Sequence, residues 1–226
     1  MNGPHLPPIF RAVPLGGGDA FAWALAHARE EGAATLAWGV HGGRFGCAVV
    51  LEPDEPTRTA RTVLFAAMLA LGEALGTLGP PAVPLLFGWP NRIELNGGVA
   101  AEFEVGIGPE EGGVPSWLVL GATVELGPED GPDDAPGRDP GRTSLREEGF
   151  GAVGAGELLE AYARYLLNWI DRWQEGGFEA VRAHWTARWD AAACGASGLD
   201  GTGALLLADG RRVPLADGMA AAGRGA

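Results

Sequence analysis

The stretch LFGWPNRIELNGGVAAEFEVGI, residues 86–107, constrains the fold of this chain more than any other part of its sequence. Two segments in which apolar and polar residues alternate lie on either side of Asn96-Gly97-Gly98, and an Asn-Gly pair is typical of a tight hairpin turn. The same alternation places Glu102 and Glu104 on one face of the second strand. The stretch therefore predicts a β-hairpin that is entered through a corner at Trp89-Pro90-Asn91.

The rest of the chain changes repeatedly between helical and strand patterns. Asp19 is a good N-cap for a helix that ends near Gly32 and has an inner face of Phe21, Leu25 and Ala28. Leucine and methionine residues recur at three- and four-residue steps between Pro56 and Gly79-Pro80, which predicts a long helix there. Further strands are expected at residues 35–38, 45–51, 83–89, 92–95, 99–105 and 117–124, and further helices at 157–173 and 178–193. The last helix is expected to bury Phe178, Val181, Trp185 and Trp189. This mixture indicates an α+β fold in which helices pack against a mixed sheet.

Composition divides the chain into three parts. Residues 1–18 are rich in Pro and Gly and are expected to form a surface arm, and residues 19–193 are expected to form the main domain. Residues 194–226 are expected to form a small C-terminal module with a flexible tail, in which Asp209-Gly210 is the turn of a second hairpin. Residues 127–142 are too acidic and too rich in Pro and Gly to pack, which predicts a solvated loop.

The charge of the chain limits its partners. The formal net charge is −13, and all 16 basic residues are Arg. No nucleic acid and no membrane are expected as partners, because phosphate binding needs clustered Lys or Arg and no run of about 18 apolar residues predicts a membrane span. The N-terminus shows no secretory signal, and two distant cysteines indicate reduced thiols. We therefore expect a cytoplasmic protein in which no reaction step uses a lysine of this chain.

Four short pieces occur in order along about 60 residues. They are Trp89-Pro90-Asn91, Asn96-Gly97-Gly98-Val99-Ala100, WLVLGATVEL (117–126) and TSLREEG (143–149). Together they resemble the biotin protein ligase and lipoate–protein ligase superfamily, which has Lys-Trp-Pro-Asn-Asp, Lys-Val-Ala/Cys-Gly, Gly-Ile-Gly-Ile-Asn-Val and Thr-Ser-Leu at these places. The resemblance covers residues 19–190. It implies a class II synthetase-like mixed sheet flanked by helices, followed here by a shortened C-terminal module with a β-hairpin.

The polar positions of the family's active site differ in this chain. The resemblance implies that the essential lysine of the family aligns with Gly98, which offers only a backbone amide. In the family that lysine neutralises charge on the attacking carboxylate and the α-phosphate during adenylation, an effect typically worth a few kcal/mol. In the family's Lys-Trp-Pro-Asn-Asp motif, the first lysine corresponds to Gly88 of this chain and the final aspartate corresponds to Arg92. The family's loop that closes over the acyl-adenylate corresponds in this chain to the short segment His41-Gly42-Gly43-Arg44. The Ser-Thr-Asn that opens the family's first helix corresponds to Gly17-Gly18-Asp19, and the Asn of its Gly-Ile-Asn strand corresponds to Thr123.

These changes predict a family member that keeps the scaffold but lacks the usual adenylation chemistry, so no catalytic residue is assigned. We expect a pocket over the sheet that binds a biotin-, lipoyl- or acyl-type ligand, or a biotinyl or lipoyl carrier domain. The expected ligand-binding residues are Trp89, Asn91, Gly98, Gly121 and Thr123, with Arg44 and Arg92 as charge donors.

Three alternatives remain open. The chain could be an active ligase that uses ATP and biotin, or lipoate or octanoate, with Arg44 or Arg92 stabilising charge and a carrier-domain lysine as acceptor. Cys47 could be the nucleophile of an acyl transfer if a nearby base formed the thiolate, although its apolar strand favours a buried structural cysteine. The chain could also be a structural or regulatory partner without a ligand. The four His residues show no metal-binding spacing, and no metal is expected.

Overall fold

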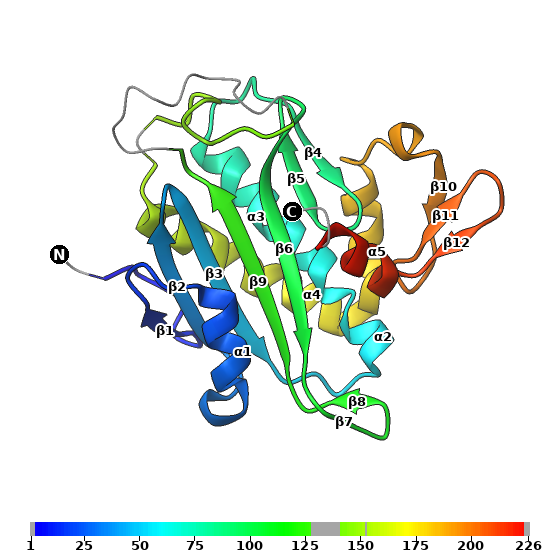
Figure 1. The fold of residues 1–226 in the computed structure, drawn as a ribbon, viewed down its shortest axis with the longest axis horizontal. Coiled ribbons are helices and arrows are strands. Elements are labelled where there is room, and N and C mark those ends of the chain that lie inside the picture. The colour runs from blue at the N-terminus through cyan, green and yellow to red at the C-terminus, as the bar shows by residue number, and fades with distance from the viewer. Residues whose placement is uncertain (1–2, 128–140, 152, 224–226) are drawn as a thin grey trace.

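A computed structural model describes residues 3–127, 141–151 and 153–223 of the chain (Figure 1). Of the predicted loop at 127–142, residues 128–140 lie outside these ranges. In chain order the elements are β1 (Arg11–Pro14), α1 (Ala20–Glu31), β2 (Thr35–His41), β3 (Arg44–Leu51), α2 (Thr57–Ala60), α3 (Val63–Leu78), β4 (Leu85–Gly88), β5 (Arg92–Leu95), β6 (Gly98–Ile107), β7 (Glu110–Glu111), β8 (Val114–Pro115), β9 (Leu118–Glu125), α4 (Ala155–Thr186), η1 (Ala192–Cys194), β10 (Ala196–Leu199), β11 (Leu205–Leu207), β12 (Arg212–Val213) and α5 (Leu215–Ala222).

Seven strands form the central sheet, in the order β1-β2-β3-β9-β6-β5-β4. β1, which lies within the expected surface arm, pairs parallel with β2, and every other neighbouring pair is antiparallel. The predicted hairpin is present as β5 and β6, and its turn places Asn96 and Gly97 at φ values of 50° and 88°. Asn and Gly adopt this left-handed conformation more readily than other residues, which is why the pair marks the turn. The predicted mixed sheet is confirmed.

The main core lies between one face of the sheet and helices α3 and α4. Along α3 four of the five predicted inner positions are almost completely buried, namely Leu64, Met68, Leu71 and Leu75, and the fifth, Leu78 at the end of the helix, is half-buried. The segment Thr57–Leu78 is long and apolar enough to cross a membrane, but 72% of its 18-residue window with a mean hydropathy of 1.4 is buried inside the fold. Its apolar composition is therefore accounted for by its place in the core.

The two helices predicted beyond residue 155 form one element, α4, with a break at Gly177. Gly177 has a φ of 61° and a ψ of −159°, a conformation that glycine adopts at little cost. The element ends at Thr186 rather than at the predicted residue 193. Trp189 therefore lies beyond the helix, where it is half-buried and its backbone bridges to Phe87 at the edge of the sheet. The other predicted core residues of this part are buried: Phe178, Val181 and Trp185.

Helix α1 covers the opposite face of the sheet, over β2, β3 and β9 (Figure 1). Asp19 caps the helix as predicted, because its Oδ1 accepts a hydrogen bond of 3.0 Å from the N–H of Ala22. The predicted inner face is only partly right. Phe21 and Leu25 are half-buried along the side of the helix, and the buried face consists of Ala20, Ala24 and Ala28. Three alanines one turn apart let the helix backbone lie close to the sheet.

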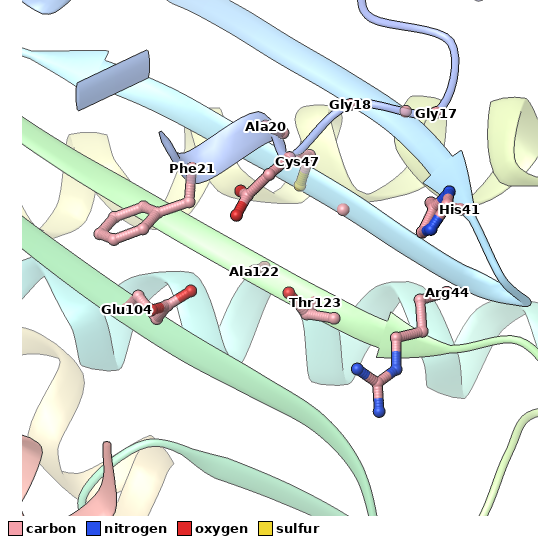
Figure 2. Close-up of a pocket in the computed structure, with 13 residues that line it drawn as sticks. Gly17, Gly18, Ala20, Phe21, His41, Arg44, Cys47, Glu104, Ala122 and Thr123 are labelled. Atoms are coloured by element: carbon pink, nitrogen blue, oxygen red, sulfur yellow. The ribbon is translucent and has the colours of Figure 1, made fainter. Parts of the chain in front are cut away.

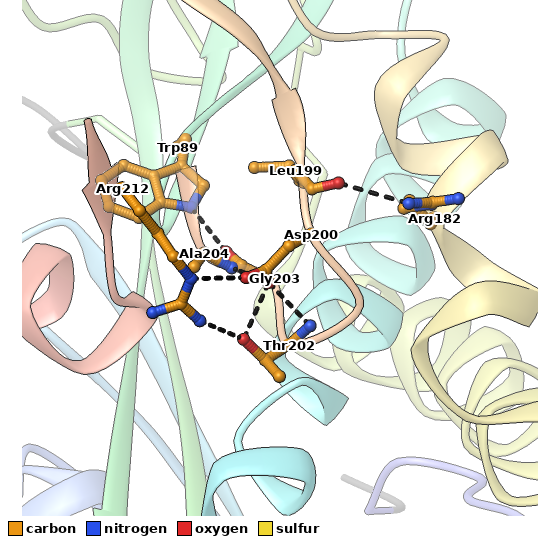
Figure 3. A network of polar contacts seen from close by, with 8 residues as sticks. All are labelled: Trp89, Arg182, Leu199, Asp200, Thr202, Gly203, Ala204 and Arg212. Atoms are coloured by element: carbon orange, nitrogen blue, oxygen red, sulfur yellow. Dashed lines mark hydrogen bonds and ion pairs between the residues drawn. The ribbon is translucent and has the colours of Figure 1, made fainter. Parts of the chain in front are cut away.

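The C-terminal module begins after α4. The predicted hairpin at Asp209-Gly210 is present as β11 and β12, and β10 and α5, which the sequence did not reveal, complete the module. The indole Nε1 of Trp89 donates a hydrogen bond of 3.0 Å to the carbonyl oxygen of Gly203 in this module (Figure 3). Helix α5 packs on the same indole, because a Cβ added at Gly218 would overlap its ring. The module is therefore anchored to the corner that opens the β5–β6 hairpin.

A carboxylate organises the loop between β10 and β11 (Figure 3). Oδ1 of Asp200 accepts hydrogen bonds from the backbone N–H groups of Thr202 and Ala204, at 2.8 and 3.1 Å, and from the hydroxyl of Thr202 at 2.7 Å. Oδ2 of Asp200 accepts from Nε of Arg212 at 2.6 Å. These bonds fix the loop that presents the Gly203 carbonyl to Trp89.

Candidate functional site

A row of residues crosses the outer face of the sheet beyond the start of α1. Thr123 of β9 is in register with Gly46 of β3 on one side and with Glu102 of β6 on the other, and Glu102 is in register with Arg92 of β5. Because side chains alternate between the two faces of a strand, the next residue on β6, Phe103, points into the core and is completely buried. The row and the N-terminal end of α1 bound the candidate site.

A cavity of about 230 Å³ lies between the N-terminal end of α1 and this part of the sheet (Figure 2). Gly46 on β3 helps to keep it open, because it has no side chain to fill the space. Its partner Gly39 on β2 instead lets the backbone of Gly16 approach closely, since a Cβ at Gly39 would lie 2.7 Å from the carbonyl oxygen of Gly16. The lining consists of Gly17, Gly18, Asp19, Ala20, Phe21, Gly39, His41, Arg44, Gly46, Cys47, Glu104, Ala122 and Thr123. The cavity is therefore built by the start of α1, the β2–β3 hairpin, and the strands β6 and β9 from later in the chain.

The two ends of the cavity differ in charge. Figure 2 shows Glu104 near Phe21 at one end, and His41 and Arg44 toward the other. Desolvation raises the pKa of Glu104, and the nearby carboxylates of Asp19 and Glu102 raise it further. The end of the cavity that contains Glu104 is therefore a region of negative potential.

Arg142 is the centre of an ion-pair cluster beside the cavity. Its Nη2 lies 2.8 Å from Oε2 of Glu102 and 3.1 Å from Oε1 of Glu125. Nε of Arg44 lies 2.9 Å from the same oxygen of Glu125. Two arginines are thus paired with two glutamates. Sequence reasoning missed Arg142 because it placed the residue in a solvated loop; the available signal was its position directly before the Thr-Ser-Leu piece.

The space around Gly98 is filled by the segment that carries Arg142. The N–H of Val99 donates to the carbonyl of Gly141 and the N–H of Thr143 donates to the carbonyl of Val99, both at 3.0 Å. A Cβ added at Gly98 would lie 2.9 Å from Cβ of Thr143 and 3.2 Å from the carbonyl carbon of Arg142. A lysine at this position would therefore meet the neighbouring chain at its first side-chain atom.

The structure separates the seven residues that the sequence suggested for ligand binding. Arg44 and Thr123 line the cavity. Arg92 lies on the same outer row and is half-buried. Gly121, also on β9, is covered by Phe21, since a Cβ there would lie 2.6 Å from the phenyl ring.

The remaining members of the set lie at the two ends of β5, Trp89 and Asn91 in the corner before it and Gly98 after the turn that follows it. Asn91 is buried, and its Nδ2 donates a hydrogen bond of 2.7 Å to the carbonyl of Phe103 on the next strand. Trp89 contacts the C-terminal module, as described above. Gly98 lies at the far turn of the same hairpin, against Thr143. The cavity instead includes Asp19 and Glu104, which the sequence suggested only as a helix cap and as a strand-face residue.

Cys47 lines the cavity but has the properties of a structural cysteine. It is 3% exposed, and burial raises the pKa of its thiol to about 12, partly offset by a hydrogen bond with the backbone of Ala122. At neutral pH the thiol is therefore protonated, and a thiolate is required for nucleophilic attack. The structure favours the buried structural role over acyl transfer.

The fold is that of the biotin protein ligases. A biotin protein ligase-like protein of unknown function from a Silicibacter species superposes with a TM-score of 0.81, at 27% identity, over 94% of this chain and 97% of that chain. The biotin protein ligase from Aquifex aeolicus superposes with a TM-score of 0.72, at 14% identity, over 90% of this chain and 95% of that chain. The Aquifex enzyme has also been solved in complex with biotin and ATP.

The sequence comparisons define the family. The model of the biotin/lipoate A/B protein ligase family matches residues 6–187. A biotin–[acetyl-CoA-carboxylase] ligase from Paracoccus denitrificans is 32% identical over 172 residues, which are 74% of this chain and 70% of that protein. The chain belongs to the biotin/lipoate A/B protein ligase family, which confirms the resemblance and the predicted fold.

Proposed function

We propose that this chain binds a small ligand in the cavity beside α1 and does not convert it to an adenylate. The observation that carries the proposal is the closed surrounding of Gly98. A lysine is absent there, and Thr143 occupies the space that its side chain would need. The position that supplies the essential cation in the family is therefore structural in this chain.

Arg142, whose backbone lies against Gly98, does not replace that cation. Arg142 lies beside Gly98, but it is paired with both Glu102 and Glu125. A cation stabilises an adenylation transition state when its charge is directed at the developing negative charge. The two glutamates compensate Arg142, and a nucleotide phosphate placed near it would also meet their carboxylates. The electrostatic stabilisation required for adenylation is lost from this place.

The relatives suggest the class of ligand and partner. The Aquifex ligase binds biotin and ATP, and the Paracoccus relative has the name of a ligase that acts on acetyl-CoA carboxylase. We extend to this chain a biotin-, lipoyl- or acyl-type ligand, or a carrier domain that bears such a group, in a cytoplasmic protein. The cavity is smaller than the range of about 300–1,000 Å³ typical of pockets for drug-sized ligands, which favours the smaller acids of this class.

The proposal is tested by ligand binding and by chemistry on the same preparation. The melting temperature is measured with biotin, lipoate and octanoate, because a ligand at a hundred times its Kd adds about 2.7 kcal/mol to the free energy of unfolding. Gly46→Val narrows the cavity and should remove the shift, whereas Gly76→Ala, a helical glycine with open space around it, should leave it unchanged. Acid-dependent ATP–pyrophosphate exchange should be absent.

An active ligase is the second candidate, and the 32% identity to a named ligase favours it. In that case Arg44 or Arg92 would stabilise the charge, and ATP and biotin or lipoate would be substrates. Exchange at enzyme-like rates that depends on either arginine would replace the proposal by this alternative. If no acid changes the melting temperature, a structural or regulatory role without a ligand is the remaining interpretation.

A further inference from the structure

The outer face of the sheet carries two kinds of carboxylate. Glu102 and Glu125 are paired with arginines, as described above. Asp19 and Glu104 line the cavity, and no ion pair among the described residues involves either of them. Among the described carboxylates of this face, Asp19, Glu104 and Glu94 of β5 form no ion pair, and of these three only Asp19 and Glu104 line the cavity.

The geometry leaves both groups able to accept from a ligand. Oδ1 of Asp19 is used by the N–H of Ala22, which leaves Oδ2. Glu104 projects from β6 toward the same space (Figure 2). Two carboxylates that share a cavity repel each other unless a proton or a cation lies between them. A ligand with a positive charge at the end that lies between the two carboxylates removes this repulsion. A ligand with an anionic or apolar group at that end does not.

The opposite end of the cavity suits a carboxylate. Arg44 and His41 lie there (Figure 2). Although Nε of Arg44 contacts Glu125, a guanidinium has five N–H donors, and its terminal nitrogens remain able to bind an anion. Between the two ends the floor is formed by Gly46, by Thr123 and by the backbone of Ala122, whose side chain points into the core on the other face of the sheet. This floor leaves room for an unbranched chain.

We propose that the cavity selects a small zwitterion, with a protonated amine between Asp19 and Glu104 and a carboxylate toward Arg44. This inference rests on the proposed function, since it names the ligand class of the same cavity. It narrows the acids proposed for the cavity to those that also carry an amine, since lipoate and octanoate have a carboxylate but no positive charge.

The test uses calorimetry on the full chain with three probes of similar length. ε-Aminocaproate carries both charges, caproate carries only the carboxylate, and n-hexylamine carries only the amine. We expect ε-aminocaproate to bind at least about tenfold more tightly than either of the others, as each charge-assisted contact is worth about tenfold or more. Glu104→Gln should remove most of this preference, and Glu111→Gln, an exposed change of the same charge on β7, should not.

Each outcome decides between the inference and the function on which it rests. The inference that the cavity selects a zwitterion is overturned if caproate binds as tightly as ε-aminocaproate. It is also overturned if octanoate or lipoate binds and ε-aminocaproate does not. Either result leaves the proposed binding function intact. Binding of n-hexylamine as tight as that of ε-aminocaproate also overturns the zwitterion inference, because the Arg44 end would contribute nothing. Absence of binding by all probes and by biotin, lipoate and octanoate overturns both. If Glu104→Gln does not fold, Asp19→Asn provides the same test, because Asn also caps a helix.

Discussion

Thr143 fills the space that a side chain at position 98 would occupy, since a Cβ on Gly98 would lie 2.9 Å from Cβ of Thr143. The position that the resemblance aligns with the family lysine is therefore closely surrounded in this chain. The segment that contains Gly141 and Thr143 is bound to Val99 by two backbone hydrogen bonds. The backbone therefore holds Thr143 beside Gly98, and a change of the Thr143 rotamer alone would not move this segment away. We therefore expect that a lysine substituted at residue 98 alone would be obstructed by Thr143.

Gly98→Ala should destabilise the protein by about 1–3 kcal/mol, the usual cost of forcing an extra carbon into a well-packed place. The new methyl group would press on Thr143 and on the carbonyl carbon of Arg142. Urea unfolding followed by circular dichroism measures the change in the free energy of unfolding.

A matched control for this change is Gly76→Ala in α3, where a Cβ meets no atom within 4 Å. It should be neutral or stabilising by up to about 1 kcal/mol, because alanine is the better helix former. Thr143→Gly should rescue part of the cost of Gly98→Ala when the two are combined. Strict additivity of the two changes would contradict the contact.

Gly218→Ala should loosen the C-terminal module, because the added methyl group would overlap the indole of Trp89. We expect a loss of about 1–3 kcal/mol from the overpacked contact, together with faster hydrogen exchange in α5. Ala220→Gly, an exposed change in the same helix, controls for helix propensity and should leave the contact with Trp89 in place. Unchanged exchange of residues 215–222 in Gly218→Ala would show that α5 does not depend on this contact.

Asp200 should make the module sensitive to acid. Partial burial raises the pKa of Asp200, but hydrogen bonds from Thr202, Arg212 and the N–H of Ala204 outweigh it and lower the pKa from 3.8 to about 2. Since the folded pKa lies below the unfolded one, the stabilisation is complete above the unfolded pKa and is lost as the pH falls from about 4 to about 2. After allowance for solvent screening it amounts to about 1 kcal/mol.

The measurement compares wild type with Asp200→Asn at neutral pH and at about pH 2.5. The difference in the free energy of unfolding should shrink at the acid end, because at this pH Asp200 is protonated in the unfolded chain and the advantage of its ionised form in the folded protein is partly lost. A difference that stays constant or grows in acid would exclude the role assigned to this carboxylate.

The two cysteines should differ in reactivity toward iodoacetamide at slightly alkaline pH. Cys194 is exposed and should be alkylated in the native protein. Cys47 is buried with a pKa of about 12 and should react only when denaturant is added. Mass spectrometry counts the adducts, and Cys194→Ser should give none under native conditions. Native labelling of Cys47 would reopen the nucleophile hypothesis.

Local chemistry in the sequence was sufficient for the elements whose determinants are neighbours along the chain. Asp19 predicts the start of α1, because a cap bonds to an amide three residues later. Asn96 and Gly97 predict the β5–β6 turn, because both tolerate positive φ. The ordered pieces from Trp89 to the Thr-Ser-Leu segment were enough to indicate the family, because each piece is a short contiguous run of residues.

The composition of the site was decided by contacts between distant segments. Sequence spacing gives no distance between Asp19 and Glu104, or between Gly98 and Thr143, because these pairs meet only when the strands and α1 assemble. The sequence by itself determined the scaffold and the missing lysine, since both are written in local patterns. Only the tertiary structure decided that Arg142 is compensated, that Trp89 anchors the C-terminal module, and that two carboxylates face one cavity, because burial and charge depend on what packs nearby.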